Sequence, residues 1–422
     1  MYNSKLYSIL NDFNKYEQNR CRKYIQSPYF NKNQGINELF EGIVEAINEI
    51  SELELTKEVL WERMEPGKEF SDVRFRKYCS DLLKLLEGFL AQEVYQENPL
   101  HQATYLIEAV SRRDLNKLYN STMRTARRLS DQQRLRPASY YFYQYEIERN
   151  FYQMHQYDSN KKDVSNIEAI ANNLDYFFIA EKLRYYVSVL NRQYEISHEY
   201  EIRFMEDIIQ QIKKLDYESI PPIAIYYQLY LAMTDSENDE HYFKLKNLLQ
   251  QYGLLFPEEE ASLLYNGAIN YCTRKINRGQ AGFLKEYFDL YKDLLEKEII
   301  IVEGELDPRH FKNLVLAGLR LGEIGWTEQF IKGYQVYLPE HERDNAVTFN
   351  LAQVYFYKKD HDRVIEMLHN VEYNDLSYNL NSKNFLICTY YEIDEIEALY
   401  SLLESFRVFL NRRKNIPARR RR

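Results

Sequence analysis

The chain has 422 residues, of which 45% are hydrophobic and 28% are charged, and its formal net charge is −9 at pH 7. This mixture is typical of a folded globular protein, because a disordered chain has too few apolar residues to bury. The negative balance works against a protein that binds nucleic acid over its whole surface.

The cysteines and the chain start indicate the compartment. The four cysteines lie far apart without a C-x-x-C pair, which favours free thiols in a reducing environment. The first sixteen residues lack the apolar core of a signal peptide, and the longest aliphatic run is only Ile299 to Val302. We therefore expect a soluble, cytoplasmic protein without a membrane span.

Apolar residues recur at helical spacing along most of the chain, and no segment alternates with a period of two. Prolines such as Pro221, Pro257 and Pro308 stand just before such segments, where a helix tolerates them. The predicted helices are 35–50, 71–94, 99–112, 114–131, 138–155, 166–193, 198–214, 222–234, 239–252, 258–277, 280–297, 308–323, 326–338, 343–358, 361–371, 380–392 and 394–411. The predicted class is all-α.

The N-terminal region, 1–135, shows no repeat that we can place. Its segment Tyr24-Ile-Gln-Ser-Pro-Tyr-Phe-Asn-Lys-Asn33 resembles one that recurs in uncharacterised bacterial helical proteins, a resemblance that implies no activity. Proline at 28 disfavours helical geometry in the residue before it, and Asn31 to Gly35 supply a turn. We expect one helix to end and another to begin here.

A basic stretch from Arg112 to Arg136 holds eight basic and two acidic residues. Arg124, Arg127 and Arg128 share one helix face, and an aromatic run over 140–143 follows, a combination found where single-stranded nucleic acid stacks. The same arginines also suit ion pairs with Glu146 or Glu148 on the next helix. Both readings stay open at this point.

One layout of a small or apolar residue, a large one a turn later and an apolar one on the next helix occurs three times. The spacing is 34 and then 35 residues, with the members Gly318, Leu321 and Phe330, then Ala352, Tyr355 and Val364, then Ile387, Tyr390 and Leu399. Such spacing predicts helical hairpins that each bury a face against the next. The fifty-residue gap from Ala268 to Gly318 indicates an insertion of about sixteen residues.

The run Asn350-Leu351-Ala352-x-x-Tyr355-x-x-Lys358-Lys359-Asp360 resembles a tetratricopeptide repeat, and residues 310–410 share this resemblance in degenerate form. It implies a helical-hairpin repeat solenoid, a tetratricopeptide-like superhelix, over 136–411. It also implies a concave groove for a peptide or partner helix. The groove positions that follow are Ala346, Phe349, Gln353, Phe356 and Tyr357 in one unit, and Asn381, Asn384, Cys388, Tyr391 and Glu392 in the next. Phe349, Phe356 and Tyr357 equally suit packing against the adjoining helix.

We find no pattern that carries chemistry. The eight histidines are dispersed without metal-ligand spacing, and no glycine-rich phosphate loop or G-x-S-x-G turn occurs. We therefore predict no catalytic residue, no cofactor and no metal site.

The sequence favours a non-catalytic scaffold that binds a protein or peptide partner in a concave groove. Its best candidate residues are Phe349, Gln353, Phe356, Tyr357, Asn384 and Tyr391. The alternative is a nucleic-acid-associated protein that uses Arg124, Arg127 and Arg128 together with a basic tail, 412–422. The partner and the oligomeric state do not follow from the sequence.

Overall fold

The computed structural model describes residues 2–48, 55–155, 166–193, 200–214, 217–369 and 376–412. Over these residues it holds twenty α-helices, three 3₁₀ helices and two strands of two residues each, so the predicted all-α class is confirmed. Apart from Arg412, which ends the last helix, the predicted basic tail lies outside the described residues.

The chain divides into two compact units, and it passes between them more than once. The first unit comprises Met1–Gln133 and Tyr143–Ile170, and the second comprises Arg134–Phe142 and Ala171–Arg422. The predicted border at residues 135 and 136 lies beside the first crossing, but the stretch from Tyr143 to Ile170 belongs to the first unit.

The first unit contains two separate hydrophobic cores. One gathers around Phe40, Trp61 and Phe75, and the other around Ile107, Met123 and Ile147. The helices that supply them are α1 (Lys5–Asp12), α2 (Lys15–Ile25), α3 (Gln34–Ile47), α4 (Lys57–Met64), α5 (Asp72–Glu97), α6 (Pro99–Arg112), α7 (Asn116–Gln132) and α8 (Ala138–His155).

The segment between α2 and α3 shows how local side chains end one helix and begin the next. Helix α2 ends at Ile25, and the Asn31 side chain donates a hydrogen bond to the Ile25 carbonyl oxygen at 3.1 Å. Asn33 caps α3 by accepting from the Gly35 amide at 3.0 Å. These caps replace partners that the helix-end groups lack within the helix.

The second unit is built on one large hydrophobic core that runs from Ala138 to Leu386. Its helices are α9 (Ile167–Gln193), α10 (Met205–Ile212), α11 (Pro221–Thr234), α12 (Glu240–Tyr252), α13 (Glu258–Asn277), α14 (Phe283–Glu296), α15 (Pro308–Arg320), α16 (Ile324–Tyr334), α17 (Glu340–Tyr357), α18 (His361–His369), α19 (Leu376–Glu392) and α20 (Ile396–Arg412). Short 3₁₀ helices stand at Tyr217–Ser219, Gly253–Leu255 and Gln335–Tyr337.

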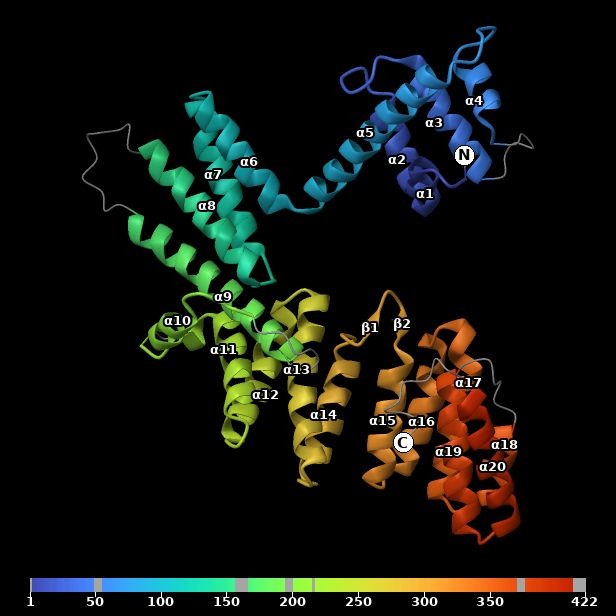
Figure 1. Ribbon diagram of the computed structural model, residues 1–422. Helices are drawn as coiled ribbons and strands as arrows, with labels where there is room; N and C mark the ends of the chain where they lie inside the picture. Colours follow the sequence, from blue (N-terminus) through green and yellow to red (C-terminus); the bar gives the residue numbers. More distant parts are fainter. Residues whose placement is uncertain are drawn as a thin grey trace. The chain divides into compact units, whose positions relative to one another are not determined.

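From α11 onward the helices pack as consecutive hairpins, each against its neighbours in sequence order (Figure 1). The first helices of successive hairpins also meet, since α11 packs on α13, α15 on α17, and α17 on α19. Helices α13 and α15 are not among these closely packed pairs.

A short β-hairpin stands between α14 and α15, where the sequence predicts an insertion but no strand. Strand β1 (Ile301–Val302) pairs antiparallel with β2 (Glu305–Leu306). Glu303 and Gly304 join them with φ angles of 53° and 81°, which matches the two-residue turns that favour hairpins. The prediction that the chain has no strand is wrong here, because two-residue strands leave no alternating pattern to detect.

Gly318 on α15 is the small residue that lets α16 approach. A Cβ atom at this position would overlap the hydroxyl of Thr327, which is fully buried and donates to the Glu323 carbonyl oxygen at 2.8 Å.

We expect Gly318→Ala to lower the free energy of unfolding by about 1–2 kcal/mol in urea titrations followed by circular dichroism. In a Thr327→Ala background the same change is expected to be neutral or stabilising, because alanine has the higher helix propensity. Stabilisation by Gly318→Ala alone would contradict this contact.

Buried tyrosines join neighbouring helices through their hydroxyl groups. Four of them donate to a carboxylate on another segment: Tyr226 to Glu260 at 2.7 Å, Tyr242 to Glu286 at 3.0 Å, Tyr265 to Asp293 at 2.6 Å and Tyr271 to Asp239 at 2.8 Å. Burial raises the pKa of all four hydroxyl groups, so they remain protonated donors at neutral pH. The rings fill the core while the hydroxyls bind across it, which gives the tyrosines of this unit a structural role.

Three of these four carboxylates also bind a lysine. Lys246 binds Glu286 at 2.6 Å, Lys297 binds Asp293 at 2.8 Å, and Lys275 binds Asp239 at 2.6 Å. Lys275 is the most deeply buried of the three, with only 3% of its side chain exposed. Each of these three carboxylates therefore binds both a tyrosine hydroxyl and a lysine ammonium. This pairing matters because a buried charge without a partner is costly.

Candidate functional site

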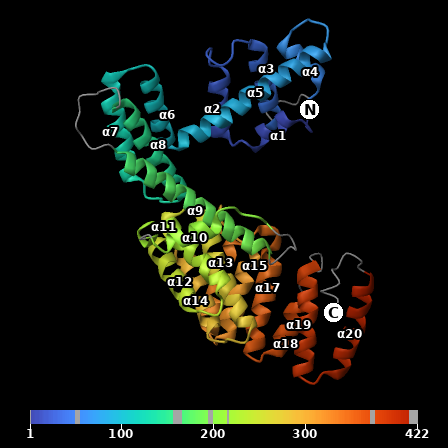
Figure 2. The same cartoon turned by 60° about the vertical axis from the view of Figure 1, so that its left-hand side comes forward.

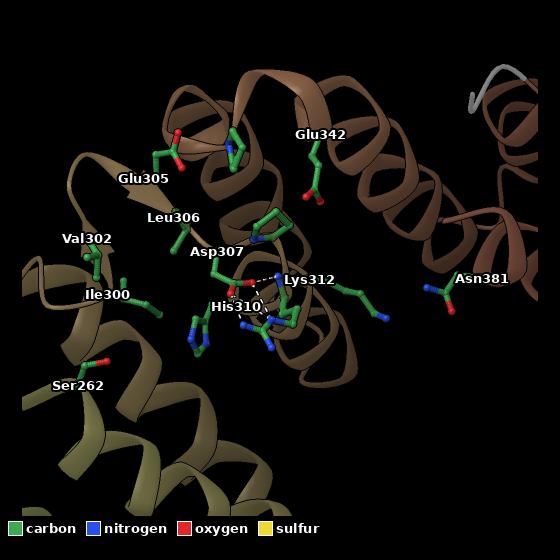
Figure 3. Close-up of a pocket in the computed structure, with 13 residues that line it drawn as sticks. Ser262, Ile300, Val302, Glu305, Leu306, Asp307, His310, Lys312, Glu342 and Asn381 are labelled. Atoms are coloured by element: carbon green, nitrogen blue, oxygen red, sulfur yellow. Dashed lines mark hydrogen bonds and ion pairs between the residues drawn. The ribbon is translucent and has the colours of Figure 1, made fainter. Parts of the chain in front are cut away.

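An open cavity of about 660 Å³ lies where the hairpin packing is interrupted, between α13 and α15 (Figure 3). Its walls come from α13, the β-hairpin, the first turn of α15, the start of α17, and α19. The residues that carry its polar character are Ser262, Glu305, Asp307, Arg309, His310, Lys312, Glu342 and Asn381. This volume lies within the range of sites that hold small molecules or peptide side chains.

The β-hairpin fixes one wall of the cavity. Ile300 and Leu306 are buried and anchor the hairpin to the core, whereas Val302 is 48% exposed. In Figure 3 the labelled Val302 and Ile300 side chains lie on the hairpin side, and Ser262 lies on the helix below them. The hairpin thus supplies an apolar edge beside polar groups.

Asp307 and Arg309 lie at the N-terminal end of α15, where the helix borders the cavity. Asp307 caps the helix by accepting from the Arg309 amide at 2.7 Å, and its carboxylate also accepts from the Arg309 guanidinium at 2.5–3.0 Å (dashed in Figure 3). That guanidinium lowers the pKa of Asp307, so the carboxylate is ionised at neutral pH. Because 87% of the Arg309 side chain is exposed, the guanidinium keeps donors for a ligand.

His310 lines the cavity and is held by a hydrogen bond to Tyr291. Its Nδ1 lies 3.0 Å from the Tyr291 hydroxyl, and Asn313 donates to that same hydroxyl at 3.4 Å. Burial lowers the pKa of His310, which favours the neutral ring at pH 7. We therefore assign His310 a hydrogen-bonding role in the wall.

The remaining polar groups come from three different helices. Lys312 lies on α15, Glu342 on α17 and Asn381 on α19, and Figure 3 shows all three around the same space. Glu342 has 34% of its side chain exposed, and His341 lies 3.5 Å away. A cation, an anion and an amide around one open space suit a ligand with charges of both signs and free amide groups.

Two of the predicted groove residues are buried and do not line an exposed surface. Phe349 is 4% exposed and Gln353 is 5% exposed, because α19 covers this face of α17. Phe349 lies 6.2 Å from Phe385 of α19, between ring centroids, and Phe356 lies 4.9 Å from the same ring. The assignment of Phe349 and Gln353 to an open groove is therefore wrong, and Phe356 is part of the α17–α19 contact.

The other candidate groove residues are exposed, and none of them lines the cavity. Tyr357 is 38% exposed and Tyr391 is 74% exposed, and Asn384 is also exposed. Tyr357 is fifteen residues beyond Glu342 on the same helix, which is about 22 Å along its axis. Of the positions that the resemblance implied, Asn381 is the one that lines the cavity.

The sequence reasoning missed the cavity residues on the hairpin and on α15. Two signals for them are present in the sequence: the fifty-residue gap before Gly318, and the Asp307-Pro308 pair that starts a helix. What no local pattern indicates is that the starts of α15 and α17 and the side of α19 meet around one space.

The three arginines of the basic stretch have different surroundings. Arg127 pairs with Glu148 at 3.5 Å and lies over the Phe151 ring at 4.7 Å, which is the ion pair considered from the sequence. Arg124 is exposed and donates to the Asn120 carbonyl oxygen of its own helix at 3.3 Å. Arg128 is exposed as well.

Comparisons with known proteins found no matching family model, no matching curated protein and no matching solved structure. Within the described ranges, histidine, cysteine and acidic side chains form no group of three or more that is arranged to hold a metal ion. No helix in the described part of the chain has the length and apolar character needed to cross a membrane.

Proposed function

We propose that the protein is a non-catalytic scaffold that binds an extended peptide segment of a partner protein in the cavity between α13 and α15. On this proposal the hairpins from α11 to α20 form a tetratricopeptide-like solenoid, and the first helices of the hairpins make its inner wall. The observation that carries the proposal is that side chains from four of these hairpins and from the β-hairpin surround one open space.

The chemistry of the walls supports a peptide as the occupant. A peptide presents side chains of either charge and a backbone with both donors and acceptors, and Lys312, Glu342 and Asn381 complement these groups. Val302 and the prolines at 308 and 339 add apolar contact beside them. The cavity spans several helices, which suits a chain that runs across them.

The nucleic-acid alternative has weaker support. It depends on Arg124, Arg127 and Arg128 acting together with the basic tail, 412–422, and Arg127 is already paired with Glu148 and stacked on Phe151. Its distinguishing behaviour is binding that collapses with added salt and disappears in an Arg124→Ala, Arg128→Ala variant.

Reversing the charges of the cavity tests the proposal. We expect Lys312→Glu combined with Glu342→Lys to reduce recovery of the partner by about tenfold in affinity purification with mass spectrometry, after nuclease treatment. The matched control is Lys332→Glu with Glu366→Lys, the same two changes at exposed positions on α16 and α18. Equal recovery by both variants and the wild type would contradict the proposal.

A further inference from the structure

A second hollow, of about 590 Å³, lies between α9 and α10, and both helices are labelled in Figure 2. We call it the α9–α10 groove. Its lining includes Asp175, Phe178, Ile179, Phe204, Asp207 and Ile208. All these residues belong to the second unit, and none lines the cavity between α13 and α15.

The apolar walls of the α9–α10 groove include two exposed aromatic rings. Phe178 is 42% exposed and Phe204 is 64% exposed, whereas Ile179 and Ile208 form a buried floor between them. Exposed phenylalanines on both sides of a hollow with an aliphatic floor are typical of a site that receives a large apolar side chain.

Phe204 is held in a conformation that bulky residues rarely adopt. Its backbone has a φ of 65° and a ψ of 10°, the left-handed region, directly before the first residue of α10. The Phe204 side chain makes no cap hydrogen bond to the helix, so helix capping does not explain this backbone conformation. Its consequence is that the ring stands at the groove, and such strain is often found where a side chain is placed for binding.

The charged side chains that line the groove are both acidic. Asp175 and Asp207 are both exposed and line it, and over the described residues neither has a salt-bridge partner within 4 Å. Lys182 borders Phe178, with its Nζ 5.8 Å from the ring centroid, but that ammonium donates to the Arg203 carbonyl oxygen at 3.3 Å. A ligand that brings its own cation would meet two carboxylates beside an apolar floor.

We propose that the α9–α10 groove docks a segment of a partner protein in which a large apolar side chain is flanked by lysine or arginine. The apolar side chain fills the space between Phe178 and Phe204, and the flanking cations reach Asp175 and Asp207. A peptide that is basic on both sides of its anchor fits better than an acidic one, because Asp175 and Asp207 lie on different helices of the groove. This site does not depend on the cavity function proposed above.

The direct test is fluorescence anisotropy with the full chain and two labelled hexapeptides, Arg-Leu-Trp-Leu-Arg-Arg and its counterpart Glu-Leu-Trp-Leu-Glu-Glu. We expect the basic peptide to bind with a Kd below about 100 μM and the acidic one to bind at least about tenfold more weakly. Equal affinity for the two peptides, or no binding of either at millimolar protein, would overturn the proposal.

Variants of the groove residues test whether the basic peptide binds in the α9–α10 groove. Asp175→Asn with Asp207→Asn is expected to weaken the basic peptide by about tenfold, and Phe204→Ser should weaken it at least as much. The controls are Tyr185→Ser, an aromatic on α9 that is 58% exposed and outside the groove, and Asp344→Asn, an exposed carboxylate on α17. If the controls weaken binding as much as the groove variants do, the peptide binds elsewhere and the proposal fails.

Two further readouts keep the result unambiguous. The two aspartate changes are on the surface, so they test the site even if Phe204→Ser alters the fold, which far-UV circular dichroism would reveal. Light scattering detects the competing occupant: if Phe204→Ser turns a dimer into a monomer while no peptide binds, the groove joins two copies of the chain and the proposal is overturned. The Lys312→Glu, Glu342→Lys variant should bind the basic peptide like the wild type, which separates this site from the cavity.

Discussion

Phe349→Ala is expected to lower the free energy of unfolding by about 3–5 kcal/mol, the usual cost of removing a buried phenylalanine. The ring is 4% exposed and packs against Phe385 of the next hairpin, so its loss leaves a cavity at the α17–α19 contact. Urea titration followed by far-UV circular dichroism measures the change.

Tyr391→Ala provides the matched control for Phe349→Ala. Tyr391 is an aromatic on α19 that is 74% exposed, and its replacement should change the free energy of unfolding by less than about 0.5 kcal/mol. The opposite pattern, an unchanged Phe349→Ala and a strongly destabilised Tyr391→Ala, would mean that the face of α17 bearing Phe349 is open and that α19 does not cover it.

Asp239→Ala is expected to lower the free energy of unfolding by about 2–3 kcal/mol, somewhat less than for a fully buried pair. The change leaves the Lys275 ammonium, with 3% of its side chain exposed, without its carboxylate, and it removes the acceptor of the Tyr271 hydroxyl. We set the expected loss of stability below that of a fully buried pair because 39% of the Asp239 side chain is exposed, so water compensates in part. The measurement is again urea titration.

A double variant and a pH series identify the cause of that loss. Asp239→Ala with Lys275→Met should recover most of the stability, because no unpaired charge then remains buried. Burial opposes ionisation of Asp239, but hydrogen bonds from Lys275 and Tyr271 outweigh it and lower its pKa. The stability from this carboxylate is therefore present above its unfolded pKa of about 3.9 and is lost as the pH falls through the lower folded value. Equal acid sensitivity of the wild type and Asp239→Ala would contradict this assignment.

Much of the helical layout follows from the sequence because long amphipathic segments and prolines mark it. Helices α11 and α15 begin at Pro221 and Pro308 as the proline positions predict, and α5 to α9 lie close to their predicted ranges. The short helices α1 and α4 were not predicted, and of α2 only its end before Pro28 was, because eight to eleven residues hold too few turns to show a clear apolar stripe.

The candidate site was predicted less well, because it depends on contacts between distant segments. The helical spacing identifies Phe349 and Gln353 as one face of α17, but only the position of α19 decides that this face is covered. Likewise, Lys312 and Asn381 are sixty-nine positions apart and become neighbours of one cavity through the packing of three hairpins. Burial and convergence of this kind leave no trace in local periodicity.

Site-specific photocrosslinking tests the central claim most directly, namely that the partner binds on the first helices of the hairpins beside the cavity. A photoreactive phenylalanine analogue is placed at Asn381, which lines the cavity, or at Glu366, which is exposed on α18. The account predicts a discrete covalent adduct with one partner protein from position 381 and none from position 366. The same adduct from both positions, or an adduct from position 366 alone, would contradict it.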